Sequence, residues 1–316
     1  MRDRTLSIQA RTVKAMSRRR FIAWLSVTVL ATGAIWYGIT TLRNDPVPTN
    51  PVAQLSKPEH LRTAPVARES TPNALGSPLW SAADPQSATV HFSILRSRAE
   101  AGDMVAQREL AKLYQQCSVF SLSPENMYAT LDAYAAARGV PQSTYTGIKH
   151  RFSATCSAVD GGQVIPQDAY TSWFERAANQ GDTYSKVAVA SKNFVTLGAD
   201  DYLSLARDVI NSGDPEAIFS LGDLLALAPE SSDFAELKRA TTGPYANYAW
   251  GVVACRMGAD CGPASYRLDS LCINTGICGL GNFEDAIRNG AVADGQQESL
   301  DRAIEEVQRA VGKKPY

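Results

Sequence analysis

The sequence predicts an all-α protein: an α/α hairpin solenoid with a disulfide-stapled C-terminal helical region, preceded by one transmembrane helix. Three observations predict this fold class. From residue 84 onward, Ala, Leu and charged residues recur at helical spacings, with little alternation of period two. Three segments of this body align without gaps on a Gly-Asp pair. Near the N-terminus, residues 21–42 contain no charged residue and no proline.

The 316 residues are expected to form five parts. These are a cytoplasmic basic segment (1–20), a transmembrane signal anchor (21–42), a proline-rich disordered stalk (43–83), helical repeats (84–230) and a Cys-rich C-terminal helical region packed on the repeats (231–316). The stalk is rich in Pro, Thr, Ser and Ala, a composition that buries too little apolar area to fold and favours extended polyproline II.

Residues 21–42 are long enough to cross a membrane, because a helix needs about 20 apolar residues to span the hydrocarbon core. Trp24 and the Trp36-Tyr37 pair lie toward the two ends, where amphipathic rings favour the interface. Arg18-Arg19-Arg20 precede the segment directly. The positive-inside rule then predicts a single-pass protein of the bacterial inner membrane, with its N-terminus in the cytoplasm and its C-terminal domain in the periplasm.

Three alternatives for the N-terminal region stay open. A cleaved signal peptide has a shorter apolar region, normally about 7–15 residues, followed by a small-residue cleavage site. Residues 17–22 also resemble the bacterial twin-arginine export signal, although Ala23 stands where that signal has Lys. Met16 is an alternative start of translation.

The distribution of charge argues against a nucleic-acid partner. Residues 1–42 hold seven of the 31 Lys and Arg residues and one acidic residue, Asp3, so residues 43–316 carry a net charge of −7. Affinity for nucleic acid comes mostly from basic groups that neutralise phosphates. We therefore expect no nucleic-acid binding.

The three Gly-Asp pairs predict helical hairpins. A glycine ends one helix in the left-handed conformation, and the aspartate that follows caps the next helix. Four residues after each glycine lies a small residue that lets the two helices approach. The pairs, each with its small residue, are Gly102-Asp103 with Ala106, Gly181-Asp182 with Ser185, and Gly213-Asp214 with Ala217. Repetition of such a hairpin makes a solenoid.

This pattern resembles the Sel1-like repeat of the tetratricopeptide-like α/α hairpin family. The matching lines are residues 99–114 and the arm from Trp173 to Asp182, and the resemblance covers about 85–230. The middle copy departs from the pattern at Ser185 and at Lys192, where Leu is expected. The resemblance implies a protein-binding function. A generic helical bundle is the alternative.

No motif in the chain indicates catalysis. The three histidines, His60, His91 and His150, are isolated, and no H-E-x-x-H, G-x-S-x-G or phosphate-loop pattern occurs. We therefore expect no catalytic residue, no metal ligand and no cofactor. Five aromatic residues are candidates for a partner groove, with core packing as the alternative. They are Trp173, Phe174, Tyr245, Tyr248 and Trp250.

Six cysteines are predicted to form disulfide bonds, because the domain is expected to lie in an oxidising compartment. Cys117 and Cys156 are expected to pair. Cys255, Cys261, Cys272 and Cys278 form two C-x₅-C units, whose spacing exceeds the C-x₂₋₄-C of common zinc sites. Two local bridges within these units are favoured, and crossed pairs between the units stay possible.

The resulting hypothesis is a membrane-anchored periplasmic scaffold that binds an unknown periplasmic or envelope protein. The alternative is a cell-wall or glycan-binding or hydrolytic protein with an unmarked site. A deep cleft that holds an acid with a strongly raised pKa would favour that alternative. A purely structural or regulatory anchor without a groove is the third possibility.

Overall fold

The computed structural model describes residue 80, residues 84–229 and residues 234–312. The predicted basic segment and membrane anchor lie outside these residues, as does the predicted stalk except for Trp80. Within the described residues the protein consists of thirteen α-helices and contains no strand, which confirms the all-α class. None of the described helices has both the length and the apolar character needed to span a membrane.

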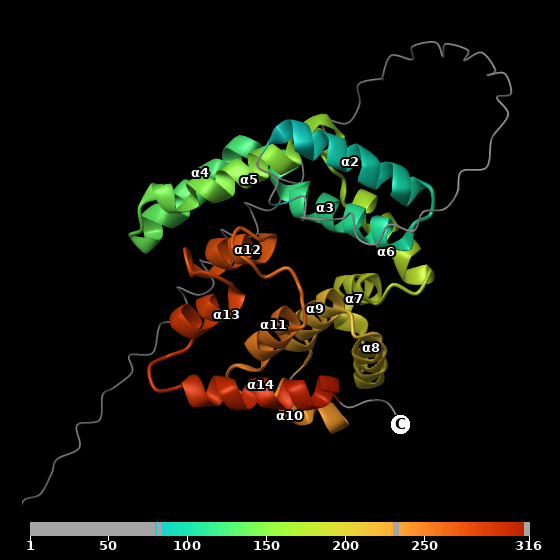
Figure 1. Ribbon diagram of the computed structural model, residues 1–316, viewed down its shortest axis with the longest axis vertical. Helices are drawn as coiled ribbons and strands as arrows, with labels where there is room; N and C mark the ends of the chain where they lie inside the picture. Colours follow the sequence, from blue (N-terminus) through green and yellow to red (C-terminus); the bar gives the residue numbers. More distant parts are fainter. Residues whose placement is uncertain (1–79, 81–83, 230–233, 313–316) are drawn as a thin grey trace, which may run out of the picture. The chain divides into compact units, whose positions relative to one another are not determined.

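The helices follow one another with short connections (Figure 1). They are α2 (Pro85–Glu100), α3 (Met104–Leu122), α4 (Pro124–Arg138), α5 (Thr146–Cys156), α6 (Gln167–Asn179), α7 (Thr183–Lys192), α8 (Ala199–Ser212), α9 (Pro215–Ala226), α10 (Lys238–Thr241), α11 (Ala246–Arg256), α12 (Tyr266–Thr275), α13 (Phe283–Ala286) and α14 (Gln297–Gly312). Four 3₁₀ turns and one π turn lie between them, at Gln142–Tyr145, Val159–Gly162, Phe194–Thr196, Ala235–Leu237 and Ile287–Ala291.

Capping residues set the helix boundaries. α4 begins after Ser123, whose hydroxyl accepts from the Asn126 N–H at 3.3 Å, and ends at Gly139 in the left-handed conformation. α12 begins at Tyr266, because the Ser265 hydroxyl accepts from the Leu268 N–H group in its first turn.

The described helices enclose two hydrophobic cores. The N-terminal core is formed by α2 to α5 and includes Trp80 and Cys272. The C-terminal core is formed mainly by α7 to α11 with α14, and includes Leu221, Trp250 and Leu300. Residues on both sides of position 230 share this second core, so the Cys-rich region packs directly on α7, α8 and α9.

A close approach between α9 and α11 depends on Gly222. A Cβ atom at this position would lie 2.3 Å from the Cβ of Trp250, closer than two such atoms come in proteins. Trp250 is 1% exposed, and its indole N–H donates to the Ala240 carbonyl at 2.9 Å. The largest aromatic side chain of the C-terminal core therefore fits only against a glycine.

Trp80 ties the chain ahead of α2 to helices much later in the sequence. Its ring centroid lies 4.6 Å from that of Phe152 on α5 and 4.8 Å from that of Tyr266 on α12. Its indole N–H donates to Asp269 at 2.7 Å, and Arg151 pairs with the same carboxylate. The buried indole is thus fully satisfied, as a tryptophan in a core requires.

Candidate functional site

The three Gly-Asp junctions (Gly102-Asp103, Gly181-Asp182 and Gly213-Asp214) have the predicted local geometry. Each glycine has a positive φ, between 65° and 106°. Each aspartate caps the helix that follows: Asp103 accepts from the Ala106 N–H, Asp182 from the Ser185 N–H, and Asp214 from the Glu216 and Ala217 N–H groups. The small residues Ala106, Ser185 and Ala217 are completely buried.

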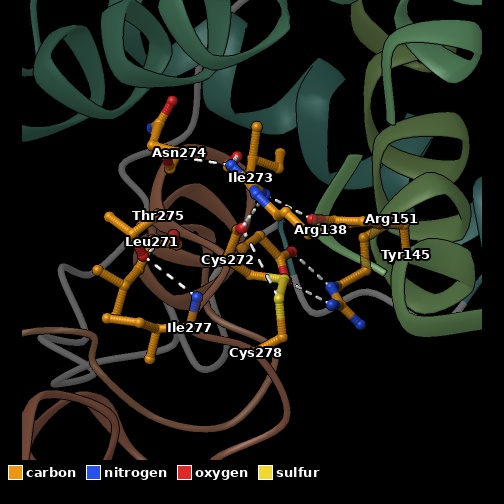
Figure 2. The surroundings of a disulfide bond; sticks show 11 residues. Arg138, Tyr145, Arg151, Leu271, Cys272, Ile273, Asn274, Thr275, Ile277 and Cys278 are labelled. Atoms are coloured by element: carbon orange, nitrogen blue, oxygen red, sulfur yellow. Dashed lines mark hydrogen bonds and ion pairs between the residues drawn. A yellow bond between two sulfur atoms is a disulfide. The ribbon is translucent and has the colours of Figure 1, made fainter. Parts of the chain in front are cut away.

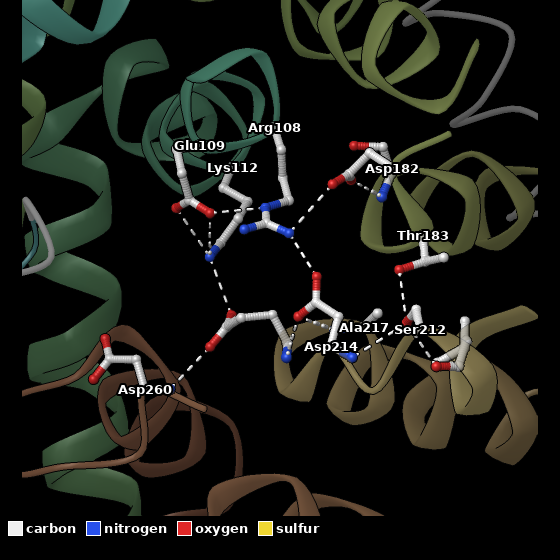
Figure 3. Close-up of polar contacts among 12 residues, drawn as sticks. Arg108, Glu109, Lys112, Asp182, Thr183, Ser212, Asp214, Ala217 and Asp260 are labelled. Carbon is white, nitrogen blue, oxygen red and sulfur yellow. Dashed lines mark hydrogen bonds and ion pairs between the residues drawn. The ribbon is translucent and has the colours of Figure 1, made fainter. Parts of the chain in front are cut away.

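The second oxygen of every capping aspartate accepts from an arginine. Oδ2 of Asp103 accepts from Arg98, the last-turn arginine of α2. Arg108 on α3 donates to the aspartates of the other two junctions. Its Nη1 lies 3.2 Å from Oδ2 of Asp182 and 2.6 Å from Oδ2 of Asp214 (Figure 3). One arginine therefore connects the N-terminal ends of α7 and α9 to α3.

A second part of this ionic network centres on Glu216 in the first turn of α9. Its Oε1 accepts from the Asp260 N–H at 2.9 Å and from Arg267 at 3.0 Å. Its Oε2 accepts from Arg267 at 2.9 Å and from Lys112 at 3.1 Å. All four lone-pair positions of this carboxylate are thus occupied.

Charge pairing, rather than burial, controls the ionisation of these groups. Burial alone would raise the pKa of Glu216, but Lys112 and Arg267 lower it well below its ordinary value. Burial alone would lower the pKa of Lys112, but Glu109 and Glu216 raise it. Lys112, Glu216 and Arg267 therefore remain charged at neutral pH, although each of their side chains is at most 17% exposed.

A cleft of about 390 Å³ opens beside this network. Its walls come from α3, α7, α9, α11, α12 and α13, so it lies where the two cores meet. Five of the lining residues are aromatic: Tyr184, Phe219, Tyr248, Tyr266 and Phe283. The volume falls within the range of about 300–1,000 Å³ that is typical of ligand sites.

The cleft also presents polar groups that the fold does not use. The side-chain amides of Gln115, Gln116 and Asn247 make no hydrogen bond with any of the described residues. Asp223 on α9 has no hydrogen bond or ion pair within the same part of the chain, and its side chain is exposed to the cleft. Such unpaired groups are available to a ligand.

Two carboxylates of the cleft have raised pKa values. Desolvation by the cleft walls raises the pKa of Asp223 to about 6, against the positive charge of Arg267, which lowers it. Burial and the negative charge of Glu216 raise the pKa of Asp260, although Arg267 and Lys112 oppose the shift. Neither carboxylate pairs with a cation in the described structure.

The five aromatic residues singled out in the sequence occupy different places. Tyr248 lines the cleft. Tyr245 and Trp250 belong to the C-terminal core, at 9% and 1% exposure. Phe174 is 3% exposed and packs against Tyr184, while Trp173 is half-buried under the guanidinium of Arg176. The structure therefore does not bring these five side chains together in one groove.

The cysteines form three disulfide bonds: Cys117–Cys156, Cys255–Cys261 and Cys272–Cys278. The two C-x₅-C units are thus bridged locally. Cys255–Cys261 closes the loop that carries Asp260, whose N–H group donates to Glu216. This disulfide therefore holds one wall of the cleft in place.

The Cys272–Cys278 bridge lies at the C-terminal end of α12 (Figure 2). Arg138, at the end of α4, donates to the Cys272 carbonyl at 3.2 Å and to the Ile273 carbonyl at 2.9 Å. A cation at this end also suits the negative pole of the helix. The disulfide and Arg138 together fix α12, the helix that supplies Arg267 to the cleft.

Sequence reasoning missed the charged residues of the cleft. Asp182 and Asp214 were predicted only as caps, and Glu216, Asp223 and Asp260 carried no motif. One signal was present: Arg108 and Lys112 lie four residues apart on α3, next to Leu110 and Ala111 of its buried face. Two cations beside the packing face of a predicted hairpin arm indicate partner carboxylates on the next hairpin.

No group of three or more potential metal-ligating side chains occurs among the described residues. In the comparisons with known proteins, no family model, curated protein or solved structure matches this chain. The chemistry of the cleft therefore has to support any functional conclusion.

Proposed function

We propose that this protein is a periplasmic helical-repeat scaffold, anchored in the bacterial inner membrane, that binds a segment of a partner protein in the cleft between its two cores. The observation that supports this proposal is the aromatic-lined cleft, whose side-chain amides make no hydrogen bond with the described residues. Amide side chains match the donors and acceptors of a peptide backbone, and aromatic rings bind side chains with little loss of conformational entropy.

The packing order of the helices supports a Sel1-like solenoid. α2 packs on α3, α3 on α6, α6 on α7, α7 on α9, α9 on α11, and α11 on α14. Each hairpin thereby contacts mainly the next one along the chain, as expected for stacked repeats. Arg108 adds a contact of longer range, because it connects α3 to Asp182 at the start of α7 and to Asp214 at the start of α9.

The proposed location is supported by the disulfide bonds together with the apolar segment 21–42 of the sequence. Disulfides persist mainly in oxidising compartments such as the periplasm. A reporter fused after residue 316 tests the topology. Alkaline phosphatase should be active there and green fluorescent protein exported by the Sec route should be dark, whereas the opposite result would place the domain in the cytoplasm.

Site-specific photo-crosslinking tests the scaffold function. A photoreactive amino acid replaces Asn247 or Gln116 in the full-length protein, in the bacterium that produces it. Irradiation should give a discrete crosslinked product from both positions. Val195, which is 81% exposed and does not line the cleft, is the matched control and should give none. Equal products from all three positions, or no product from the cleft positions, would refute the proposal.

The raised pKa of Asp223, caused by desolvation in the cleft, favours a second candidate function, binding or hydrolysis of a cell-wall glycan. A carboxylic acid that stays partly protonated near neutral pH is suited to general acid catalysis, and Asp260 supplies a second carboxylate in the same cleft. Incubation of the full-length protein with purified peptidoglycan tests this function. Release of soluble fragments that is lost in Asp223→Asn would support it, and absence of release would leave the scaffold as the function.

A further inference from the structure

The cleft and its adjoining network contain more carboxylates than cations. The cations are Arg108, Lys112 and Arg267, and the carboxylates are Glu109, Asp182, Asp214, Glu216, Asp223 and Asp260. Every one of the three cations is in hydrogen-bond contact with one or more of the first four carboxylates. All three cations of the network are therefore already paired with carboxylates other than Asp223 and Asp260.

Asp223 and Asp260 are the two carboxylates left over. Both line the cleft. The Asp260 carboxylate accepts from the Gly262 N–H group, and in Figure 3 only the backbone of Asp260, not its carboxylate, joins the network. Neither carboxylate has an ion-pair partner among the described residues, and a cation bound in the cleft would stabilise their negative charge.

The other lining groups indicate what kind of cation fits. No metal-ligating cluster exists among the described residues, so an inorganic ion would lack enough protein ligands. Aromatic faces here already hold cations: the guanidinium of Arg267 lies 4.0 Å from the ring centroid of Phe219, and Nζ of Lys112 lies 5.2 Å from that of Tyr184. Tyr248 offers a further ring. An organic cation on a flexible stem matches this lining.

We propose that the cleft selects a partner segment that carries a Lys or Arg side chain, whose positive charge is neutralised by Asp223 and Asp260. The inference rests on the proposed scaffold function and specifies the chemistry of the partner. The unused amides of Gln116 and Asn247 then bind the backbone around this basic residue. Electrostatic attraction of this kind gives specificity as well as a faster association.

A phage-displayed library of random peptides tests the inference. The library is selected on the purified full-length protein and counter-selected on the Asp223→Lys variant. The retained peptides should share a Lys or Arg at one position. Fluorescence anisotropy of a labelled peptide should show at least tenfold weaker binding when norleucine replaces that residue. Binding should also weaken at least tenfold in Asp223→Asn. The native protein should bind the peptide more tightly at low salt than at high salt, because salt screens the attraction between the charges.

Asp208→Asn is the matched control, because Asp208 is an exposed carboxylate of α8 that pairs with Lys186 away from the cleft. It should leave peptide affinity unchanged. Circular dichroism of each variant checks that the helical fold is intact, and Asp260→Asn provides a second cleft variant that keeps its backbone N–H donor.

Two results overturn the inference and differ in what else they imply. In the first, the selected peptides contain no basic residue, and their binding is lost in Asn247→Arg. The cleft would then bind peptides with another preference, and the scaffold proposal would stand. Absence of any peptide that depends on cleft residues would contradict both, and the crosslinking at Asn247 would then also be expected to fail.

Discussion

The Nη1 atom of Arg108 lies 2.6 Å from Oδ2 of Asp214, although 106 residues separate them in the chain. The other oxygen of Asp214 caps the N-terminus of α9. One carboxylate therefore both caps a helix and pairs with Arg108 on α3. Asp182 repeats this arrangement at the N-terminus of α7. The junction aspartates therefore organise the packing between hairpins as well as the turns within them.

Replacement of Arg108 by Gln should destabilise the protein by about 3–5 kcal/mol, because it leaves the buried Asp182 carboxylate without its cation. Urea unfolding followed by circular dichroism measures the change in free energy. Arg207→Gln is the control, since the pair of Arg207 with Glu236 is exposed and should contribute less than about 1 kcal/mol. Similar losses in the two variants would show that the junction contacts have no special role.

Ser185→Ala should stabilise the protein by about 1 kcal/mol. Ser185 Oγ is completely buried and has no hydrogen-bond partner among the described residues, whereas the other two junctions have alanine at the equivalent position. Removal of an unsatisfied hydroxyl removes its desolvation cost. The reverse change, Ala217→Ser, should destabilise by a similar amount. Thermal unfolding of both variants checks this, and a loss of stability in Ser185→Ala would contradict it.

Removal of the Cys255–Cys261 bridge by a double change to Ser should cost about 2 kcal/mol, since the bridge closes a short loop. The Cys117–Cys156 bridge closes a loop with a sequence separation of 39, so its removal should cost about 4 kcal/mol. Only the first change should speed hydrogen exchange at the Asp260 N–H group, because that loop holds it on Glu216. Unchanged protection of this amide would mean that the disulfide does not position the cleft wall.

The ionised form of Glu216 should make the protein sensitive to acid. Lys112 and Arg267 outweigh burial and lower its pKa below the ordinary 4.5. The stability that this carboxylate contributes is therefore fully present above about pH 4.5 and is lost as the pH falls through the lowered folded-state pKa. Glu216→Gln should cost about 3 kcal/mol at pH 7 and clearly less at about pH 3. Urea titrations at both pH values, with the exposed Glu305→Gln as control, measure the difference.

Local signals in the sequence predicted local structure well. The positive-φ glycines and capping aspartates of the three junctions could be predicted because such turns accept only a few residue types. The local bridges of the C-x₅-C units follow from the same kind of reasoning, because each unit ends one helix and folds back on it. In both cases the contacts join residues a few positions apart.

Long-range contacts could not be predicted in this way. Arg108 meets Asp214, and Arg267 meets Glu216, only after several hairpins have packed, and no spacing in the sequence encodes these pairs. The aromatic candidates illustrate the same limit. Tyr245, Tyr248 and Trp250 lie within six positions, yet the rotation of α11 turns only Tyr248 toward the cleft.

Asp223 should change stability with pH in the direction opposite to Glu216. Desolvation in the cleft raises its pKa from 3.8 to about 6, so between these pH values the folded state binds more protons than the unfolded chain. The contribution of this group to stability therefore falls as the pH rises from about 4 to 6. Asp223→Asn cannot ionise, and it should be more stable than the native protein at pH 7 but not at pH 4.

Thermal unfolding at these two pH values, with Asp208→Asn as the matched control, measures the effect. An equal difference between Asp223→Asn and the native protein at both pH values would contradict the raised pKa. A bound basic peptide should abolish the difference, because its cation lowers the pKa of Asp223 and relieves the cost of ionising it. The same measurement therefore connects the electrostatics of the empty cleft to the charge of the segment that we propose it binds.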